Sequence, residues 1–189
     1  MVPSRPMSPP LWAPWRMEYV LGKKPKDGCV FCVAPDAPGP DHDQAARAQR
    51  TAELEARLVV HEEPRCLVML NRYPFAAGHA LVIPRAHVSG LEDLDPKDHD
   101  RLFVLVRETV VRLKRALKCE GLNVGLNLGT AAGAGIAEHL HVHVVPRWSG
   151  DTNFMPVVAD TRVVPQALDA TRRHLAGYFE DLRASGDAP

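Results

Sequence analysis

The middle of the chain consists of short apolar runs that polar and turn-forming residues interrupt. Residues 57–62, 65–72 and 79–85 (RLVVHE, RCLVMLNR and HALVIPR) are rich in β-branched or aliphatic side chains, and the segments EEP and YPFAAG lie between them. This pattern predicts three strands paired in an antiparallel meander. The runs LNVGLNLG (122–129) and HLHVHVVPRW (139–148) have the same character and predict two further strands.

Two other stretches follow a helical period. In the first, Asp95 occupies the N-cap position and Pro96 the first helical position, and apolar residues recur at helical spacing up to Leu117. The second stretch begins near Pro165. Residues 34–57 are rich in Pro, Ala and charged side chains, which predicts a loop or a short exposed helix.

The order of strands, helix, strands and helix predicts an α+β domain. We expect two main helices packed against one antiparallel five-stranded sheet. The glycine patterns of Rossmann and Walker motifs do not occur, so the folds built on them are disfavoured, although nucleotide binding itself is not. We expect a flexible arm over residues 1–10, a single domain over residues 11–183 and a tail over residues 184–189.

Composition narrows the classes of partner. The 189 residues include 23 Lys and Arg against 23 Asp and Glu, so no excess charge of one sign indicates nucleic acid or a membrane surface. The proline-rich N-terminus lacks the apolar run of a signal peptide, and no stretch approaches the ~20 apolar residues of a membrane span. We therefore expect a cytoplasmic protein. Four cysteines are too few for a disulfide scaffold, and the C-x-x-C pair Cys29 and Cys32 indicates metal or redox chemistry.

Three histidines alternate with aliphatic residues at the start of the last predicted strand. Because side chains alternate between the two faces of a strand, His139, His141 and His143 would share one face. A lone histidine on an apolar strand is usually a satisfied core residue. A buried row of three without a ligand would cost about 1–3 kcal/mol for each unpaired group. The row therefore predicts a functional site, in which imidazole would serve as metal ligand, general base or nucleophile.

One end of this row completes a ligand set for a metal. The chain offers two cysteines and two histidines, the set that closes a tetrahedral zinc site, in Cys29, Cys32, His87 and His139. Such a closed site would leave the other two histidines of the row available for chemistry. We expect zinc in a structural role and no organic cofactor.

Several motifs together resemble a known family. GHALVIPRAH (78–87), GLNVGLNLG (121–129) and HLHVHVV (139–145) are similar to the histidine-triad superfamily of nucleotidyl hydrolases and transferases, whose mark is three histidines alternating with apolar residues. The flanks LWAPWRMEYV, CVFC and RWSGDTNFMPVV resemble the bacterial branch that includes diadenosine tetraphosphate phosphorylases. The resemblance implies the histidine-triad fold, an adenosine polyphosphate substrate and a homodimer whose sheets join edge to edge.

The resemblance also implies roles for individual residues. His141 would be the nucleophile that attacks the α-phosphorus and becomes a nucleotidyl-histidine, and His143 would steady the phosphate or the leaving oxygen. His79 matches an additional active-site histidine, and Asn127 matches an asparagine that helps to fix substrate or nucleophile. Trp148 matches an aromatic residue near the nucleotide. The cysteine and histidine set matches the zinc ligands of members that retain the metal.

The loop before the triad, GTAAGAGI, consists of small residues. Gly129, Gly133 and Gly135 would let backbone N–H groups approach phosphate oxygens. Relatives often place a serine, threonine or glutamine there, whereas this loop offers only backbone after Thr130, which leaves water or orthophosphate open as the acceptor. Arg147, directly after the triad strand, would either meet a distal phosphate or remain solvated.

The leading hypothesis is phosphorolysis of diadenosine tetraphosphate to ADP and ATP through a covalent nucleotidyl-histidine. One alternative is a hydrolase that uses water to cleave dinucleoside polyphosphates or AMP conjugates. A second is a metalloenzyme whose triad holds a catalytic metal. A third is a protein that binds adenine nucleotides without turnover.

Overall fold

The computed structural model describes residues 28–33, 44–151 and 167–184. The predicted arm over residues 1–10 lies outside the described residues, as does the predicted tail apart from Ala184. Among the described residues, no helix is both long enough and apolar enough to cross a membrane.

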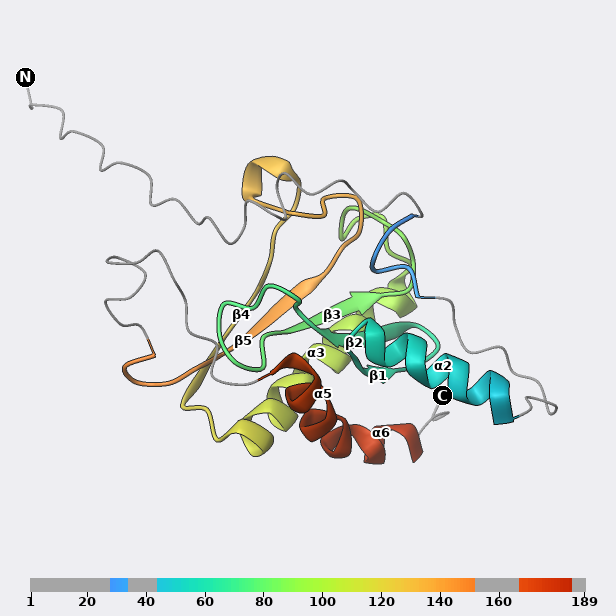
Figure 1. Cartoon of the computed structure of the whole chain (residues 1–189). Helices are drawn as coiled ribbons and strands as arrows, with labels where there is room; N and C mark the ends of the chain where they lie inside the picture. Colours follow the sequence, from blue (N-terminus) through green and yellow to red (C-terminus); the bar gives the residue numbers. More distant parts are fainter. Residues whose placement is uncertain (1–27, 34–43, 152–166, 185–189) are drawn as a thin grey trace, which may run out of the picture.

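One five-stranded antiparallel sheet forms the centre of the fold (Figure 1), in the order β1-β2-β3-β5-β4. Its strands are β1 (Val59–Glu62), β2 (Cys66–Leu70), β3 (Ala80–Pro84), β4 (Gly121–Leu126) and β5 (Val142–Arg147). The predicted meander is confirmed, because β2 pairs antiparallel with both β1 and β3. The histidine strand β5 lies between β3 and β4, so elements from both sides flank it.

The helices are α2 (Gln44–Ala56), α3 (Pro96–Leu117), α5 (Leu168–Ala176) and α6 (Glu180–Ala184), with short 3₁₀ turns η2 (Thr130–Ala132) and η3 (Gly177–Phe179). Helix α3 begins as predicted, since the Asp95 side chain accepts a hydrogen bond from the Lys97 N–H at 2.9 Å. It ends at Leu117, and the C-cap residue Lys118 has a left-handed φ of 51°. The prediction of two main helices omits α2. This helix lies within residues 34–57, for which the sequence predicted either a loop or a short exposed helix.

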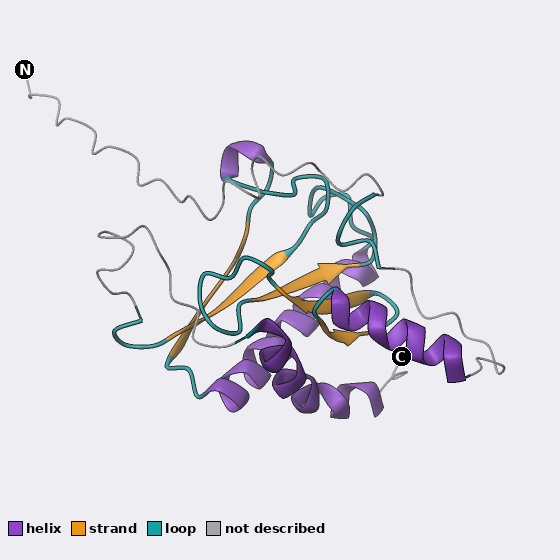
Figure 2. Cartoon of the chain, viewed as in Figure 1, coloured by secondary structure: helices purple, strands orange, loops and turns teal. Residues whose placement is uncertain are grey.

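The two faces of the sheet have different coverings. Figure 2 shows α3 and α5 on one side of the sheet, where Leu105 and Leu113 of α3 join Val142 and Val144 of β5 in the larger apolar core. The other face carries a smaller apolar cluster to which residues 28–33 contribute. The site described below lies on this second face.

Strand β5 begins later than predicted. His139 and His141 precede the ladder, because the Leu140 N–H donates to the Val88 carbonyl at 2.7 Å, in the loop after β3. Side chains still alternate between the two faces in this segment, although its backbone is not part of the strand. Leu140 packs in the apolar core beneath α3 together with Val142. The histidines accordingly remain on the opposite face.

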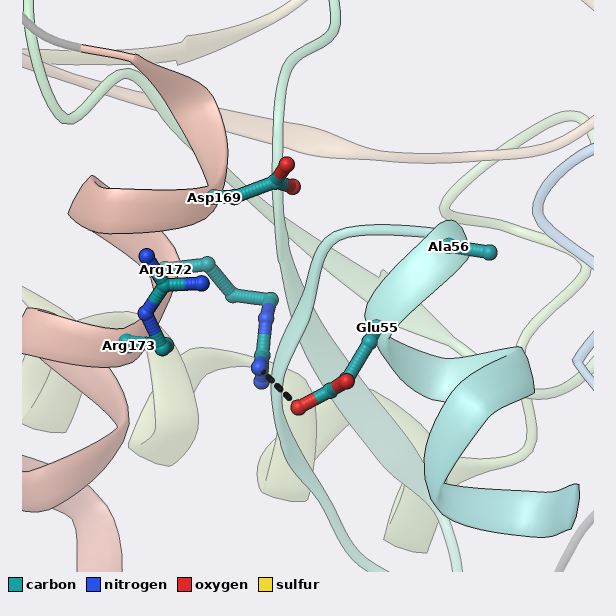
Figure 3. Close-up of a pocket in the computed structure, with 5 residues that line it drawn as sticks. All are labelled: Glu55, Ala56, Asp169, Arg172 and Arg173. Carbon is teal, nitrogen blue, oxygen red and sulfur yellow. Dashed lines mark hydrogen bonds and ion pairs between the residues drawn. The ribbon is translucent and has the colours of Figure 1, made fainter.

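Helices α2 and α5 meet at a small polar pocket (Figure 3). Arg172 of α5 donates to Glu55 of α2 at 2.5 Å across it. The remaining lining residues are Ala56, Asp169 and Arg173. No histidine lines this pocket, so it is separate from the candidate site.

Candidate functional site

Five rings lie in a row beside the sheet, on the face opposite α3. Their centroids are 4.9 Å apart for Phe31 and His141, 5.0 Å for His141 and His143, 5.2 Å for His143 and His79, and 5.0 Å for His79 and Phe75. The sequence predicted the three histidines and missed the two phenylalanines at the ends. Phe31 is 7% exposed and Phe75 39%, so one end of the row is buried and the other faces solvent.

His141 is held in one tautomer. Its Nδ1 lies 2.8 Å from the carbonyl oxygen of His139, and because a carbonyl oxygen can only accept, Nδ1 carries the proton and Nε2 the lone pair. Nε2 has no hydrogen-bond partner among the described residues. Burial lowers the pKa of His141, and the bond to the His139 carbonyl offsets this only in part. The ring is therefore neutral near pH 7, with a nitrogen available for nucleophilic attack.

A chain of hydrogen bonds sets the tautomer of His143. The Phe75 N–H donates to Nδ1 of His79 at 3.1 Å, so Nε2 of neutral His79 carries the proton and donates to Nδ1 of His143 at 3.0 Å. The proton of His143 is therefore on Nε2. Burial, followed by the neighbouring His143 and His141, lowers the pKa of His79 to about 3. His79 thus stays neutral and orients His143.

The backbone around His79 fixes it in place. Gly78 has a φ of +74°, and a Cβ added there would lie 2.3 Å from Cδ1 of Leu117 at the end of α3, so glycine is required. Asn71, which directly follows β2, places Nδ2 3.5 Å from Nδ1 of His79 and accepts the Tyr73 N–H at 2.9 Å. Sequence reasoning missed Asn71, although a polar residue directly after a fully apolar strand was a signal.

The structure brings the four predicted metal ligands together. Their ligand atoms all lie within 4.8 Å of one another, in Cys29, Cys32, His87 and His139. Nε2 of His139 donates to the Pro84 carbonyl at 2.9 Å, which leaves the lone pair on Nδ1, 3.4 Å from Sγ of Cys29. Nδ1 of His87 lies 3.1 Å from Sγ of Cys32. Two thiols and two imidazoles, one of them oriented by a backbone carbonyl, fit a tetrahedral zinc ion.

Of the triad, only His139 belongs to this cluster. Within the described residues, no other group of such ligands includes His141 or His143. The geometry therefore disfavours the hypothesis that the triad itself holds a catalytic metal.

Strand β4 shapes the neighbourhood of the reactive histidines. Leu126 and Val142 form the last pair of the two strands, and Asn127 directly follows this pair in β4 as His141 directly precedes it in β5. Gly125 pairs with His143 and has open space where a Cβ would be. Strand β4 therefore has no side chain at the position directly opposite His143.

The predicted phosphate loop is partly closed on itself. Gly129 and Gly133 have φ of +78° and +84° on either side of η2, which explains the glycines. The N–H groups of Ala132, Gly133 and Ala134 donate to carbonyls inside the loop. The N–H groups of Thr130, Ala131 and Gly135 make no such bond inside the loop.

Two predicted substrate residues lie at the other end of β5. Arg147 follows His143 by four residues, roughly 13 Å along a strand. Its guanidinium donates to both carboxylate oxygens of Asp151, at 2.6 and 2.7 Å, and to Oδ1 of Asn123 at 2.9 Å. The backbone N–H of Trp148 donates to the same aspartate at 3.2 Å. Within one chain, the structure does not bring Arg147 or Trp148 to the histidines.

A family model described as the HIT domain matches residues 52–150. The AP-4-A phosphorylase of Mycobacterium tuberculosis is 39% identical over 166 residues, which cover 88% of this chain and 82% of that protein.

Two solved structures are similar in fold. A hypothetical histidine triad nucleotide-binding protein from Sulfolobus tokodaii has a TM-score of 0.56 and 28% identity, covering 68% of this chain and 87% of its own. A Zn-bound histidine triad family protein from Mycobacterium smegmatis has a TM-score of 0.55 and 26% identity, with the same coverage of 68% and 87%. The predicted α+β architecture is that of these structures.

Proposed function

The chain belongs to the HIT domain family, and we propose that it is a nucleotidyltransferase that splits diadenosine tetraphosphate with orthophosphate into ADP and ATP. The observation that carries the proposal is the hydrogen bond from Nδ1 of His141 to the His139 carbonyl, which leaves a lone pair on Nε2 of a buried, neutral ring. Similarity to an AP-4-A phosphorylase over most of both chains supports this substrate and this acceptor.

In the first half of the reaction, Nε2 of His141 attacks the α-phosphorus of the substrate. A phosphorus–nitrogen bond forms as the bond from that phosphorus to the bridging oxygen breaks, and ATP leaves. His143, whose Nε2 carries a proton through its bond to His79, donates a hydrogen bond to the phosphate or the leaving oxygen. Neutral imidazole has an ordinary pKa of about 6.5 and attacks without further activation.

In the second half, an oxygen of orthophosphate attacks the same phosphorus. The phosphorus–nitrogen bond breaks, ADP is released and His141 returns to its neutral form. Water in place of orthophosphate would release AMP, which is the reaction of the hydrolase alternative. Splitting the reaction in two lets one nucleophile serve either acceptor.

We assign substrate contacts to Asn127 and the loop before the triad. The register of β4 and β5 supports a contact of Asn127 with the phosphate that His141 attacks. Gly135 supplies a backbone N–H that is not used inside the loop, and a small residue there lets a phosphate oxygen approach.

We also propose that the cysteine and histidine cluster binds zinc. When bound, the metal would cross-link residues 28–33 to the segment before β5. The donor set supports this, because two thiols and two imidazoles, one of them oriented by the Pro84 carbonyl, suit zinc. A cytoplasmic location, where thiols stay reduced, would keep both cysteines available to the metal, and cell fractionation tests that location.

We further propose a homodimer joined through β4. In the described sheet β4 is an edge strand, and Val124 on it is 48% exposed. An exposed apolar edge favours pairing with another strand. A monomeric mass by light scattering at micromolar concentration would contradict the dimer.

Product analysis tests the proposed reaction. The purified protein is incubated with diadenosine tetraphosphate, with and without orthophosphate, and the nucleotides are separated by chromatography. ADP and ATP that form only with orthophosphate support the proposal. AMP and ATP in both samples would make the protein a hydrolase, and stoichiometric binding without any product over hours would make it a nucleotide-binding protein.

A further inference from the structure

Phe31 lies between the two cysteines of the metal cluster and is buried, although both of its neighbours are exposed. Val30 and Cys32 face solvent, whereas Phe31 is only 7% exposed. Its ring packs in the apolar cluster of the second face, beside Leu81 and Ile83 of β3. A C-x-x-C turn that binds metal does not itself require an aromatic residue at this position.

The ring of Phe31 contacts both a metal ligand and the proposed nucleophile. Its centroid lies 5.8 Å from that of His139 at an interplanar angle of 90°, and 4.9 Å from that of His141 at 53°. His141 is also bound through Nδ1 to the carbonyl of His139. His141 therefore contacts two residues of this region: Phe31 in the cysteine turn and His139, a residue of the predicted metal cluster.

Two arginines fix the backbone on either side of Phe31. Arg57 donates to the Val30 carbonyl at 3.2 Å, and Arg85 donates to the Val33 carbonyl at 2.9 Å. Arg85 also donates to the Glu63 carbonyl at 2.7 Å, which ties the turn to the hairpin between β1 and β2. These bonds, together with the two cysteine ligands, limit how far Phe31 can move.

We propose that Phe31 is a positioning residue for His141, and that the Cys29–Cys32 turn, closed on its metal, fixes the Phe31 ring in that position. The ring blocks the rotation that would take Nδ1 of His141 away from the His139 carbonyl, swing Nε2 out of its position and free the proton on Nδ1 to move to the other nitrogen. Without it, Nε2 would no longer be held as the nucleophilic nitrogen. The expected effect on catalysis rests on the proposed function, but the restricted rotation of the His141 ring in the protein without substrate does not.

The first test separates positioning from metal binding. Phe31→Ala and the control Val33→Ala are compared as cobalt-loaded proteins, because Val33 is buried in the same cluster at 5% exposure. We expect the cobalt–thiolate absorption of both variants to match that of the unmodified protein. For Phe31→Ala, kcat should fall about 100-fold with KM nearly unchanged, since a displacement of ~1 Å has this cost. Val33→Ala should keep its kcat, and Phe31→Leu, which fills most of the lost volume, should give an intermediate value.

The second test needs no substrate. In protein labelled with ¹⁵N-histidine, the nitrogen shifts of His141 should report one tautomer, protonated on Nδ1, in the unmodified protein and in Val33→Ala. Phe31→Ala should give a mixture of tautomers, and so should unmodified protein after metal removal.

The proposal is overturned if Phe31→Ala keeps a single tautomer, or if its kcat equals that of Val33→Ala at the same metal content. If Phe31→Ala does not fold, Phe31→Leu is used for both readouts, with the same criteria. A mixture of tautomers in Phe31→Ala, in a protein whose unmodified form makes no product, would support the positioning role and refute only the proposed reaction.

Discussion

Successive side chains of β5 point to opposite faces of the sheet, and the two faces have different functions. Val142 and Val144 pack beneath α3 with Leu113 in the apolar core. There the stability of the fold depends mainly on the apolar volume of the side chains and not on bonds between particular atoms. On the opposite face, His143 of β5 and His141, which directly precedes the strand, each have a defined role for their ring nitrogens. One strand can thus carry the side chains that stabilise the fold on one face and those that take part in the reaction on the other. Substitutions on the core face should therefore change mainly the free energy of unfolding, and those on the histidine face mainly the turnover.

The largest effect is expected for His141→Asn on the histidine face. Turnover should fall by roughly 10⁴- to 10⁶-fold, as when other enzymes lose a nucleophile. Stability should change little, because the asparagine amide can still donate to the His139 carbonyl. Steady-state rates and urea unfolding measure the two effects. Turnover that survives the substitution would remove His141 from the mechanism.

The core face is tested by Leu113→Ala in α3. Leu113 is fully buried, so the free energy of unfolding should fall by about 2–5 kcal/mol, while kcat per folded molecule stays constant. Val111→Ala, on the same helix but 41% exposed, is the matched control and should change the unfolding free energy by less than about 0.5 kcal/mol. A large loss of kcat in folded Leu113→Ala would break the separation of the two faces.

Metal removal should affect the histidine face and spare the core. A metal present at 100 times its Kd contributes about 2.7 kcal/mol to folding, which chelation would remove. Hydrogen exchange should accelerate in residues 28–33 and around His139, while α3 keeps its protection. Uniform acceleration across α3 and residues 28–33 would contradict a metal that acts locally.

The pKa of His79, lowered to about 3 by burial and by the neighbouring histidines, predicts a pH dependence of stability. Between pH 6.5 and 3 the unfolded chain takes up a proton that the folded protein does not, so stability falls as the pH drops. One such group contributes about 1.4 kcal/mol per pH unit. His79→Gln should therefore lose less stability than the unmodified protein between pH 7 and pH 5 in urea unfolding. Equal losses would show that His79 does not stay neutral in the fold.

The smallest effect is expected at the far end of β5. Arg147 forms a surface ion pair with Asp151, and exposed pairs contribute 0 to about 1 kcal/mol. Arg147→Ala should therefore leave both kcat/KM and the midpoint of urea unfolding nearly unchanged. A marked loss of kcat/KM would show that Arg147 reaches a substrate after all, for example across a dimer.

The alternation of histidine and aliphatic residues was the most informative pattern in the sequence. It indicated that the three histidines share a face, and this is confirmed even though His139 and His141 precede β5. The backbone path could not be predicted, because it depends on a bond from Leu140 to Val88 in a distant loop. Similarly, the glycine-rich loop was visible in the sequence, but the bonds that occupy its N–H groups were not.

The residues that orient the site carried little signal in the sequence. Phe31 reads as one apolar residue between two cysteines, and its contacts with His139 and His141 exist only after the chain folds. For Arg147, the sequence could not choose between a phosphate and Asp151 four residues later, because both attract a guanidinium. Residue types that can carry chemistry were thus visible in the sequence, whereas the orientation of their side chains depended on tertiary contacts.

The covalent intermediate is the most direct test of the account. The protein is mixed with diadenosine tetraphosphate without orthophosphate, quenched at alkaline pH, where a phosphorus–nitrogen bond to histidine survives, and digested for mass spectrometry. We predict one adenylyl group on the peptide that contains His141, its loss with release of ADP when orthophosphate is added before the quench, and its absence in His141→Asn. Product formation with no adduct, or an adduct on a histidine other than His141, would contradict the account.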